Sequence, residues 1–362
     1  MPERDGDGGE SWVQESAPAP ARSSRLRRII GVALGLVVIV VVFAVVLPRI
    51  ANYSDVWAVL TGLSAAALLA LAVATTINVA TYGPPWMAAL PGLHYRQSMV
   101  LTQTSTALSM ALPGGDAVGI AAAYAMLRQW GFRRQSVATA VVVTGLWNQI
   151  VNVTLPLAAL VLLVLSGGSS PVLVTAGLIG MAVIVVLVGV LIMGLRSEQQ
   201  AYAVGDRGEH VANWVLRLFR RPPRTGWGAS FAEFRSGAIE LIAARWAWIT
   251  ITSFVGHLAV FGVLLVSLRA TGVGADQVSW VEALAAWGLV RLLTAVPITP
   301  GGVGIVELGL STALVGFGAS NAEAVAAVLL YRILTTLPTL VLGAALGLTW
   351  RSHRAPDQQL EG

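Results

Sequence analysis

The sequence lacks cysteine and lysine, and it is poor in charge and in histidine. Among the 362 residues there are no Cys and four His, and charged residues make up 11% of the chain. Without cysteine, disulfide bonds, cysteine-ligated zinc and thiol catalysis are excluded in any compartment. The four histidines are scattered and none belongs to a HExxH pair. We therefore expect no metal, no cofactor and no enzymatic activity.

Apolar residues dominate the remainder. Hydrophobic residues make up 56% of the chain, which is more than a soluble domain of this length could cover with polar surface. The apolar runs recur with short gaps, which predicts an all-α, polytopic helical membrane protein with one membrane domain over residues 25–350. Residues 1–24 are rich in Gly, Pro, Ser and acidic residues and are expected to be a disordered tail. Residues 351–362 are expected to be a second, short tail.

The basic residues indicate topology rather than nucleic-acid binding. The formal net charge is +5, but every basic residue is Arg, and most of them stand in the gaps between apolar runs. An excess of Arg in short loops marks the cytoplasmic side of a membrane protein. We therefore expect no nucleic-acid partner.

Six apolar runs are long enough to cross a bilayer. A helix needs about 20 residues to span roughly 30 Å of hydrocarbon at 1.5 Å per residue. The predicted spans are approximately 29–47, 56–80, 136–165, 171–195, 244–268 and 322–349.

Two further apolar segments, 98–127 and 280–318, are broken near their middles. The first is interrupted by Pro113, Gly114 and Gly115, and the second by Pro300, Gly301 and Gly302. Each segment either crosses once as a kinked helix or enters and returns as a re-entrant hairpin. A hairpin at 98–127 places residues 196–243 on the same side as the N-terminal arginines, as a cytoplasmic loop, whereas a crossing places that Arg-rich loop outside. We therefore predict two re-entrant hairpins, with both termini cytoplasmic in the cytoplasmic membrane.

The two hairpins then enter from opposite faces and form an inverted repeat. Each hairpin is followed by a long apolar helix, and Pro113 corresponds to Pro300. Inverted repeats with discontinuous helices are frequent in transporters, whose substrates bind where the broken helices meet. Irregular backbone at membrane depth is tolerated only when protein packs around it or when it lines a wet cavity. A packed turn without a ligand is the alternative to a site.

Four charged residues are candidates for substrate binding. Asp116 follows the first turn, where it either caps a half-helix or contacts a substrate. Glu307 lies deeper, where an ionisable group needs a partner. Arg291 and Arg332 either neutralise these acids or grip a phosphate. We predict that Glu307 and Arg332 lie close together in the folded core.

Amides and one histidine complete the polar residues of the spans. Asn148 and Gln149 are included among the candidates, although amides between membrane helices, like Asn152, more often join helices than bind ligands. His257 is alone in its span and is interpreted as a hydrogen-bonded core histidine, outside the site.

Two motifs carry a resemblance to a known family. The stretch AVPITPGGVGIVELGL (295–310), followed by AVLLYRILTTLP (327–338), resembles the signature of the lysylphosphatidylglycerol synthase transmembrane-region family. LPGGDAVGIAAAYAMLRQWG (112–131) is similar to that family's earlier Pro-Gly motif. The positions that match are Pro300, Gly301, Gly302, Gly304, Glu307 and Arg332, with Asp116 a looser match.

The resemblance implies a flippase-like domain that moves a lipid with a polar headgroup between leaflets. Some members carry a soluble aminoacyl-transferase domain after the membrane domain; none follows residue 350 here, so aminoacylation is not expected. The expected partners are membrane lipids, anionic or phosphate-bearing, with a homo-oligomer or an envelope enzyme as further possibilities. Two other functions stay open: an anion or proton-coupled exchanger, and a non-transporting scaffold for an envelope enzyme.

Overall fold

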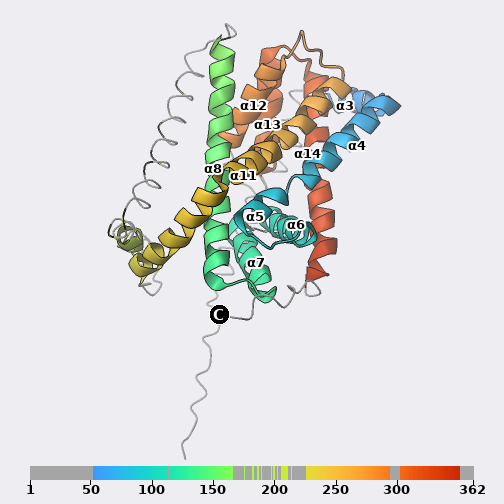
Figure 1. Ribbon diagram of the computed structural model, residues 1–362. Helices are drawn as coiled ribbons and strands as arrows, with labels where there is room; N and C mark the ends of the chain where they lie inside the picture. The colour runs from blue at the N-terminus through green and yellow to red at the C-terminus, as the bar shows by residue number, and fades with distance from the viewer. Residues whose placement is uncertain are drawn as a thin grey trace, which may run out of the picture.

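The protein is built from helices of very unequal length (Figure 1). The computed structural model describes residues 52–112, 115–165, 226–293 and 302–350, with some positions between 175 and 213. Every regular element in these ranges is a helix, as the sequence predicts. The helices are α3 (Tyr53–Thr61), α4 (Ala65–Ala80), α5 (Pro84–Ala89), α6 (Tyr95–Ala111), α7 (Gly115–Gln129), α8 (Arg134–Leu165), α11 (Trp227–Ala270), α12 (Trp280–Leu293), α13 (Ile305–Phe317) and α14 (Asn321–Gly347).

Four helical stretches of the described chain are long and apolar enough to cross a membrane: Ala65–Ala89, Arg134–Leu165, Phe234–Ala270 and Asn321–Gly347. The last three confirm the predicted spans 136–165, 244–268 and 322–349. Helix α11 is longer than expected, since it begins at Trp227, inside the range predicted as the cytoplasmic loop. The predicted spans 29–47 and 171–195 lie outside the continuously described residues. The chain is thus a multi-pass membrane protein.

The predicted span 56–80 is wrong as a single helix. The chain breaks after α3 at Gly62, and Ser64 starts α4 by accepting a hydrogen bond from Ala67 N at 3.2 Å. A serine N-cap competes with a continuous helix because its side-chain oxygen satisfies an amide that would otherwise need a backbone carbonyl. The apolar run continues through this break and hides it in the sequence.

The two broken segments fold as two pairs of short helices, α6 with α7 and α12 with α13. None of these helices exceeds 17 residues, so each is shorter than a bilayer crossing. In Figure 1 the first pair occupies the lower half of the bundle and the second pair the upper half. This placement agrees with hairpins entering from opposite faces, while membrane insertion itself stays a prediction.

The described glycines of the two turns occupy positions that a residue with a Cβ would not fit or would rarely adopt. Pro113, Gly114, Pro300 and Gly301 lie outside the described residues. Gly115 starts α7 so close to the backbone of Ser109 that a Cβ could not fit. In the second turn, Gly302 and Gly304 have φ of 66° and 89°, a backbone region that favours glycine.

The two halves pack on each other reciprocally. Helix α6 packs on α14, the helix after the second pair, while α12 packs on α8, the helix after the first pair. Gly343 of α14 lies directly against Gln103 and Ala107 of α6, and a Cβ at Gly288 of α12 would lie 2.8 Å from Pro156 Cα of α8. In both halves the first helix of a pair thus packs, through a close glycine contact, on the long helix that follows the other pair.

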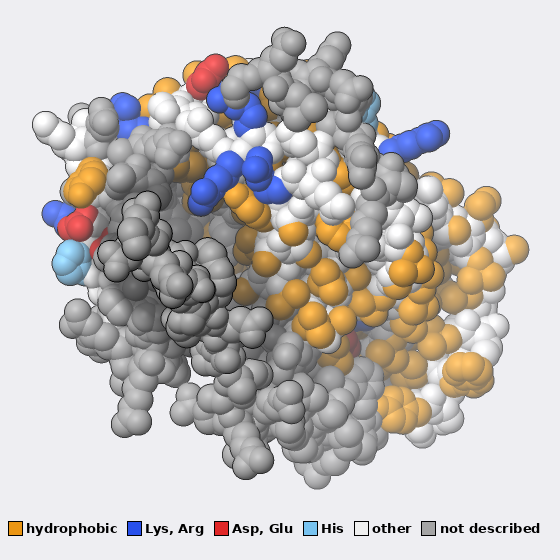
Figure 2. All heavy atoms as spheres, turned by 90° about the horizontal axis from the view of Figure 1, so that it is seen from below, with side chains coloured by type: hydrophobic (Ala, Val, Ile, Leu, Met, Phe, Trp, Pro, Cys, Tyr) orange, Lys and Arg blue, Asp and Glu red, His pale blue; other side chains and the backbone are white. Residues whose placement is uncertain are grey.

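Arginines gather at the lower end of the molecule. Arg128 lies in the last turn of α7, and Arg133 and Arg134 begin the passage into α8. Viewed from below, several blue side chains cluster on this end (Figure 2). Arg269 lies at the other end of the bundle, at the end of α11. The excess of arginine predicts that the lower end is the cytoplasmic one.

Candidate functional site

A polar cavity of about 490 Å³ lies between the two halves, with walls from α5, α6, α7, α8, α11, α12 and α14. His257 and Arg332, two of its lining residues, lie near the middles of the apolar stretch of α11 and of α14. The cavity is therefore at mid-depth of the spans that enclose it. Polar groups at this depth are costly unless they have partners or a function.

One face of α6 supplies a row of hydroxyl groups to the cavity. Thr102, Ser105, Thr106 and Ser109 all line it, and their spacing of i, i+3, i+4 and i+7 places them on one side of a helix. The side of a membrane helix that faces lipid or a sealed core is usually apolar. The hydroxyl row makes α6 the polar wall of the cavity.

Glu307 and Arg332 form a buried ion pair, as predicted. Arg332 Nε donates to Glu307 Oε1 at 2.7 Å, and the side chains are 16% and 4% exposed, respectively. The other carboxylate oxygen, Oε2, accepts a hydrogen bond from Gly304 N at 2.6 Å. Glu307 therefore caps the start of α13 as well, a role that its distance from Pro300 made unexpected. Arg332 lines the cavity, and Glu307 holds it from behind.

Arg291 belongs to a second polar cluster on the same cavity. Its Nε and Nη2 donate to Asn152 Oδ1 of α8 at 3.2 and 2.9 Å. His257 Nε2 of α11 lies 3.0 Å from the same oxygen, and its Nδ1 lies 2.9 Å from Ser253 O. Three helices are thus tied together at one amide oxygen.

The tautomer of His257 follows from its contact with the backbone. A carbonyl oxygen is only an acceptor, so Nδ1 carries the proton that bonds to Ser253 O.

Two aromatic side chains support Arg291. Its guanidinium carbon lies 4.7 Å from the ring centroid of Trp287, one helical turn earlier on α12, in the range for cation–π attraction. The indole N–H of Trp287 donates to the hydroxyl of Tyr331 at 3.0 Å. These contacts fix the Arg291 head at the cavity wall.

The structure brings most of the predicted site residues together. Asp116, Asn148, Arg291 and Arg332 all line the cavity. Gln149 and Glu307 do not: the Gln149 Oε1 accepts from Asn152 Nδ2 at 3.2 Å, and Glu307 lies behind Arg332. Glu307 thus bonds to the wall residue Arg332, and Gln149 bonds to Asn152, which in turn accepts from Arg291.

Sequence reasoning missed the place of His257 on the cavity wall and the hydroxyl face of α6, whereas Asn152 joins helices, as was expected of such amides. His257 is hydrogen-bonded as predicted, but it also lines the cavity. Its presence as an ionisable residue in a span was a usable signal. The periodicity of Thr102, Ser105, Thr106 and Ser109 was a second one. The partners of Asn152 could not be assigned because they come from α11 and α12, more than one hundred residues away.

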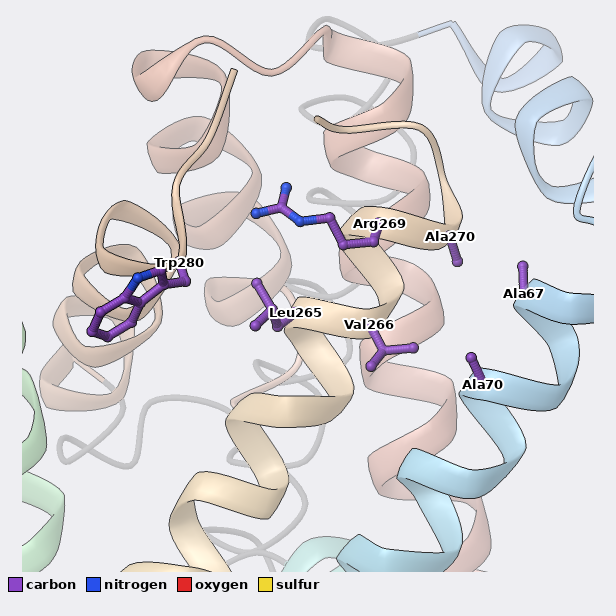
Figure 3. A pocket seen from close by; sticks show the side chains of 7 residues that line it. All are labelled: Ala67, Ala70, Leu265, Val266, Arg269, Ala270 and Trp280. Atoms are coloured by element: carbon purple, nitrogen blue, oxygen red, sulfur yellow. The ribbon is translucent and has the colours of Figure 1, made fainter. Parts of the chain in front are cut away.

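A second hollow of about 560 Å³ lies between α4 and α11 (Figure 3). It is lined by Ala67, Ala70, Leu265, Val266, Arg269, Ala270 and Trp280. The guanidinium of Arg269 donates to the carbonyls of Val273 and Val278 at 2.7 and 2.8 Å, so it secures the loop after α11. The remaining wall is nearly all apolar and suits hydrocarbon. The candidate site is therefore the polar cavity.

Acidic and histidine side chains do not gather in the part of the chain that the structure describes. No group of three or more His, Asp or Glu side chains gathers there in a way that could hold an ion. Asp116 is the carboxylate of the cavity wall, and Glu307 is committed to Arg332 and Gly304.

Comparison with known proteins supplies the family. No curated protein matches the chain significantly. The profile of the lysylphosphatidylglycerol synthase TM region matches residues 29–343, which include the two short-helix pairs, the helices that follow them and the whole polar cavity. The match agrees with the motifs around Pro113 and Pro300. The chain belongs to the lysylphosphatidylglycerol synthase TM region family.

Proposed function

We propose that the protein is a lipid translocator, not an enzyme, which moves a phosphate-bearing lipid between the leaflets of the cytoplasmic membrane. The observation that carries the proposal is the polar cavity at mid-depth, with Arg291 and Arg332 on its wall. The family assignment supports a lipid-related role in the cell envelope. In this proposal both termini are cytoplasmic.

The charge chemistry supports an anionic headgroup. A phosphate that leaves water needs charge-assisted hydrogen bonds, each worth about 1.5–3 kcal/mol. Arginine suits this task because its planar head presents several N–H donors to phosphate oxygens. Trp287, Asn152 and Glu307 hold the two guanidinium groups in place before a ligand arrives. Preorganisation of this kind lowers the cost of binding.

The rim of the cavity suits an amphipathic ligand. Ile120 lines the cavity and is 56% exposed, which places an apolar side chain at its mouth, close to Asp116. Outer faces of the spans are apolar as well, with Leu69 and Val341 exposed by 66% and 58%. An acyl chain can stay against such surfaces while the headgroup occupies the cavity.

Reconstitution tests the proposal. Purified protein in liposomes should move phosphatidylglycerol labelled on an acyl chain between leaflets faster than protein-free liposomes do, as followed by quenching of the outer label. Arg291→Gln should slow exchange about tenfold or more, equivalent to a loss of 1.4 kcal/mol. Arg133→Gln is the matched control, since Arg133 is exposed at the α7–α8 junction, away from the cavity.

The alternatives predict different results. An anion or proton-coupled exchanger would carry ion flux without lipid exchange. A scaffold for an envelope enzyme would do neither. If neither phosphatidylglycerol nor a polyprenyl phosphate moves above the protein-free rate, the translocator proposal is wrong.

A further inference from the structure

Several hydroxyl groups of the cavity wall have their hydrogens directed into the helices. Thr102 Oγ1 donates to Ser98 O at 2.8 Å, and Ser105 Oγ donates to Thr102 O at 3.3 Å. On the other walls, Thr144 donates to Ala140 O and Thr335 to Tyr331 O, both at 2.7 Å. A hydroxyl has one hydrogen and two lone pairs. These side chains therefore offer acceptor oxygens to the cavity.

The cavity thus presents acceptors and donors from different groups. Hydroxyl oxygens and the Asp116 carboxylate accept hydrogen bonds, whereas Arg291 and Arg332 donate them. A bare phosphate monoester uses the donors only. A ligand that satisfies both sets needs an anionic group and several O–H donors spread over its surface.

An ammonium headgroup fits less well. Its N–H donors could reach Asp116, but its positive charge would enter a cavity whose wall carries Arg291. Like charges in a low-dielectric interior repel strongly. A polyol or sugar supplies O–H donors without that charge, and Trp86 adds an aromatic face to the lining.

We propose that the headgroup bound in this cavity is a phosphate joined to a polyol or sugar, with the hydroxyl face of α6 contacting the polyol and Arg291 contacting the phosphate. The inference rests on the proposed function for its transport step. As a statement about ligand binding, it can be tested separately.

The transport test compares lipids that differ only in headgroup. Wild-type protein in liposomes should exchange acyl-labelled phosphatidylinositol about tenfold faster than phosphatidic acid, a difference equivalent to 1.4 kcal/mol. Lysyl-phosphatidylglycerol should be slower than phosphatidylinositol. Ser105→Ala combined with Ser109→Ala should bring the phosphatidylinositol rate down toward that of phosphatidic acid. Arg291→Gln should slow both lipids alike.

A binding test separates the inference from transport. Glycerophosphoinositol should change the tryptophan fluorescence of the purified full chain at concentrations about tenfold lower than methyl phosphate, which has no hydroxyl group on carbon, does. The Ser105→Ala, Ser109→Ala variant should lose this preference while keeping its thermal unfolding midpoint, which excludes misfolding as the cause.

The outcomes can be told apart. If lipids exchange without headgroup preference, the inference is wrong and the translocator proposal stands. If none exchanges but glycerophosphoinositol binds preferentially, the translocator proposal is wrong and the binding inference stands. If methyl phosphate binds as well as glycerophosphoinositol, the polyol assignment is overturned. If lysyl-phosphatidylglycerol exchanges as fast as phosphatidylinositol, the argument against an ammonium headgroup is overturned.

Discussion

Glu307 bonds to Arg332 with one carboxylate oxygen and to Gly304 N with the other, at 2.7 and 2.6 Å. Removing one partner of a buried ion pair leaves an uncompensated charge and costs about 3–5 kcal/mol. Arg332→Met should therefore lower the thermal unfolding midpoint strongly. Glu307→Gln should lower it as well, although glutamine can still accept from Gly304 N.

The double variant distinguishes a true pair from two independent residues. Glu307→Gln with Arg332→Met removes both charges, so its cost should be smaller than the sum of the single costs by about 1 kcal/mol or more. Thermal unfolding of all four proteins in the same detergent measures this coupling. Strict additivity would mean that the two side chains do not stabilise each other.

The polar contacts of the core differ in how far the sequence could predict them. The Glu307–Arg332 pair could be predicted because each charge at membrane depth needs an opposite one. The cluster of Arg291, Asn152 and His257 could not, since an amide oxygen gives no sign in the sequence of which helices will donate to it. Asp116 lines the cavity as its position after the first turn suggested.

At the scale of elements, the α6–α14 contact depends on Gly343. Its missing Cβ leaves room for the Gln103 carbonyl and Ala107 of α6. Gly343→Ala should separate the two helices and destabilise the protein by about 1–3 kcal/mol, as overpacking does. Gly262→Ala on α11 is the matched control, because nothing lies within 4 Å of a Cβ built there. The control should be neutral or stabilising by up to about 1 kcal/mol, from helix propensity.

Thermal unfolding in detergent compares the two alanine variants. Equal midpoints for Gly343→Ala and Gly262→Ala would contradict the close packing of α6 on α14. Gly343→Ala should also slow leaflet exchange. The reason is that Gln103, which packs against Gly343, is adjacent on α6 to Thr102 of the cavity wall.

Helix boundaries were predictable where strong breakers stand in the sequence. The Pro-Gly-Gly turns divided 98–127 and 280–318 correctly into short pairs. The break between α3 and α4 was missed because Gly62 and Ser64 are weak breakers inside an apolar run. The early start of α11 was missed because its first turns are amphiphilic and look like a loop.

At the scale of the whole molecule, the distribution of arginine predicts that the α7–α8 junction is cytoplasmic and the α11–α12 loop external. The chain contains no cysteine, so single labels are easily introduced. Ala275→Cys, in the exposed loop after α11, should react with an impermeant thiol reagent added to intact cells. Gln129→Cys, exposed at the end of α7, should react only after permeabilisation. Labelling of both positions from outside would contradict the topology.

The central claim is that a lipid headgroup passes through the polar cavity, and filling the cavity without changing its charge tests this most directly. Gly145 lines the cavity with nothing within 4 Å of a Cβ, so the fold can accept Gly145→Phe while the ring occupies the headgroup space. Gly262→Phe is the control outside the cavity lining. Leaflet exchange of labelled phosphatidylglycerol in liposomes should fall about tenfold or more in Gly145→Phe, equivalent to 1.4 kcal/mol, and stay at the wild-type rate in Gly262→Phe. Wild-type exchange in a correctly folded Gly145→Phe protein would show that the headgroup does not use this cavity.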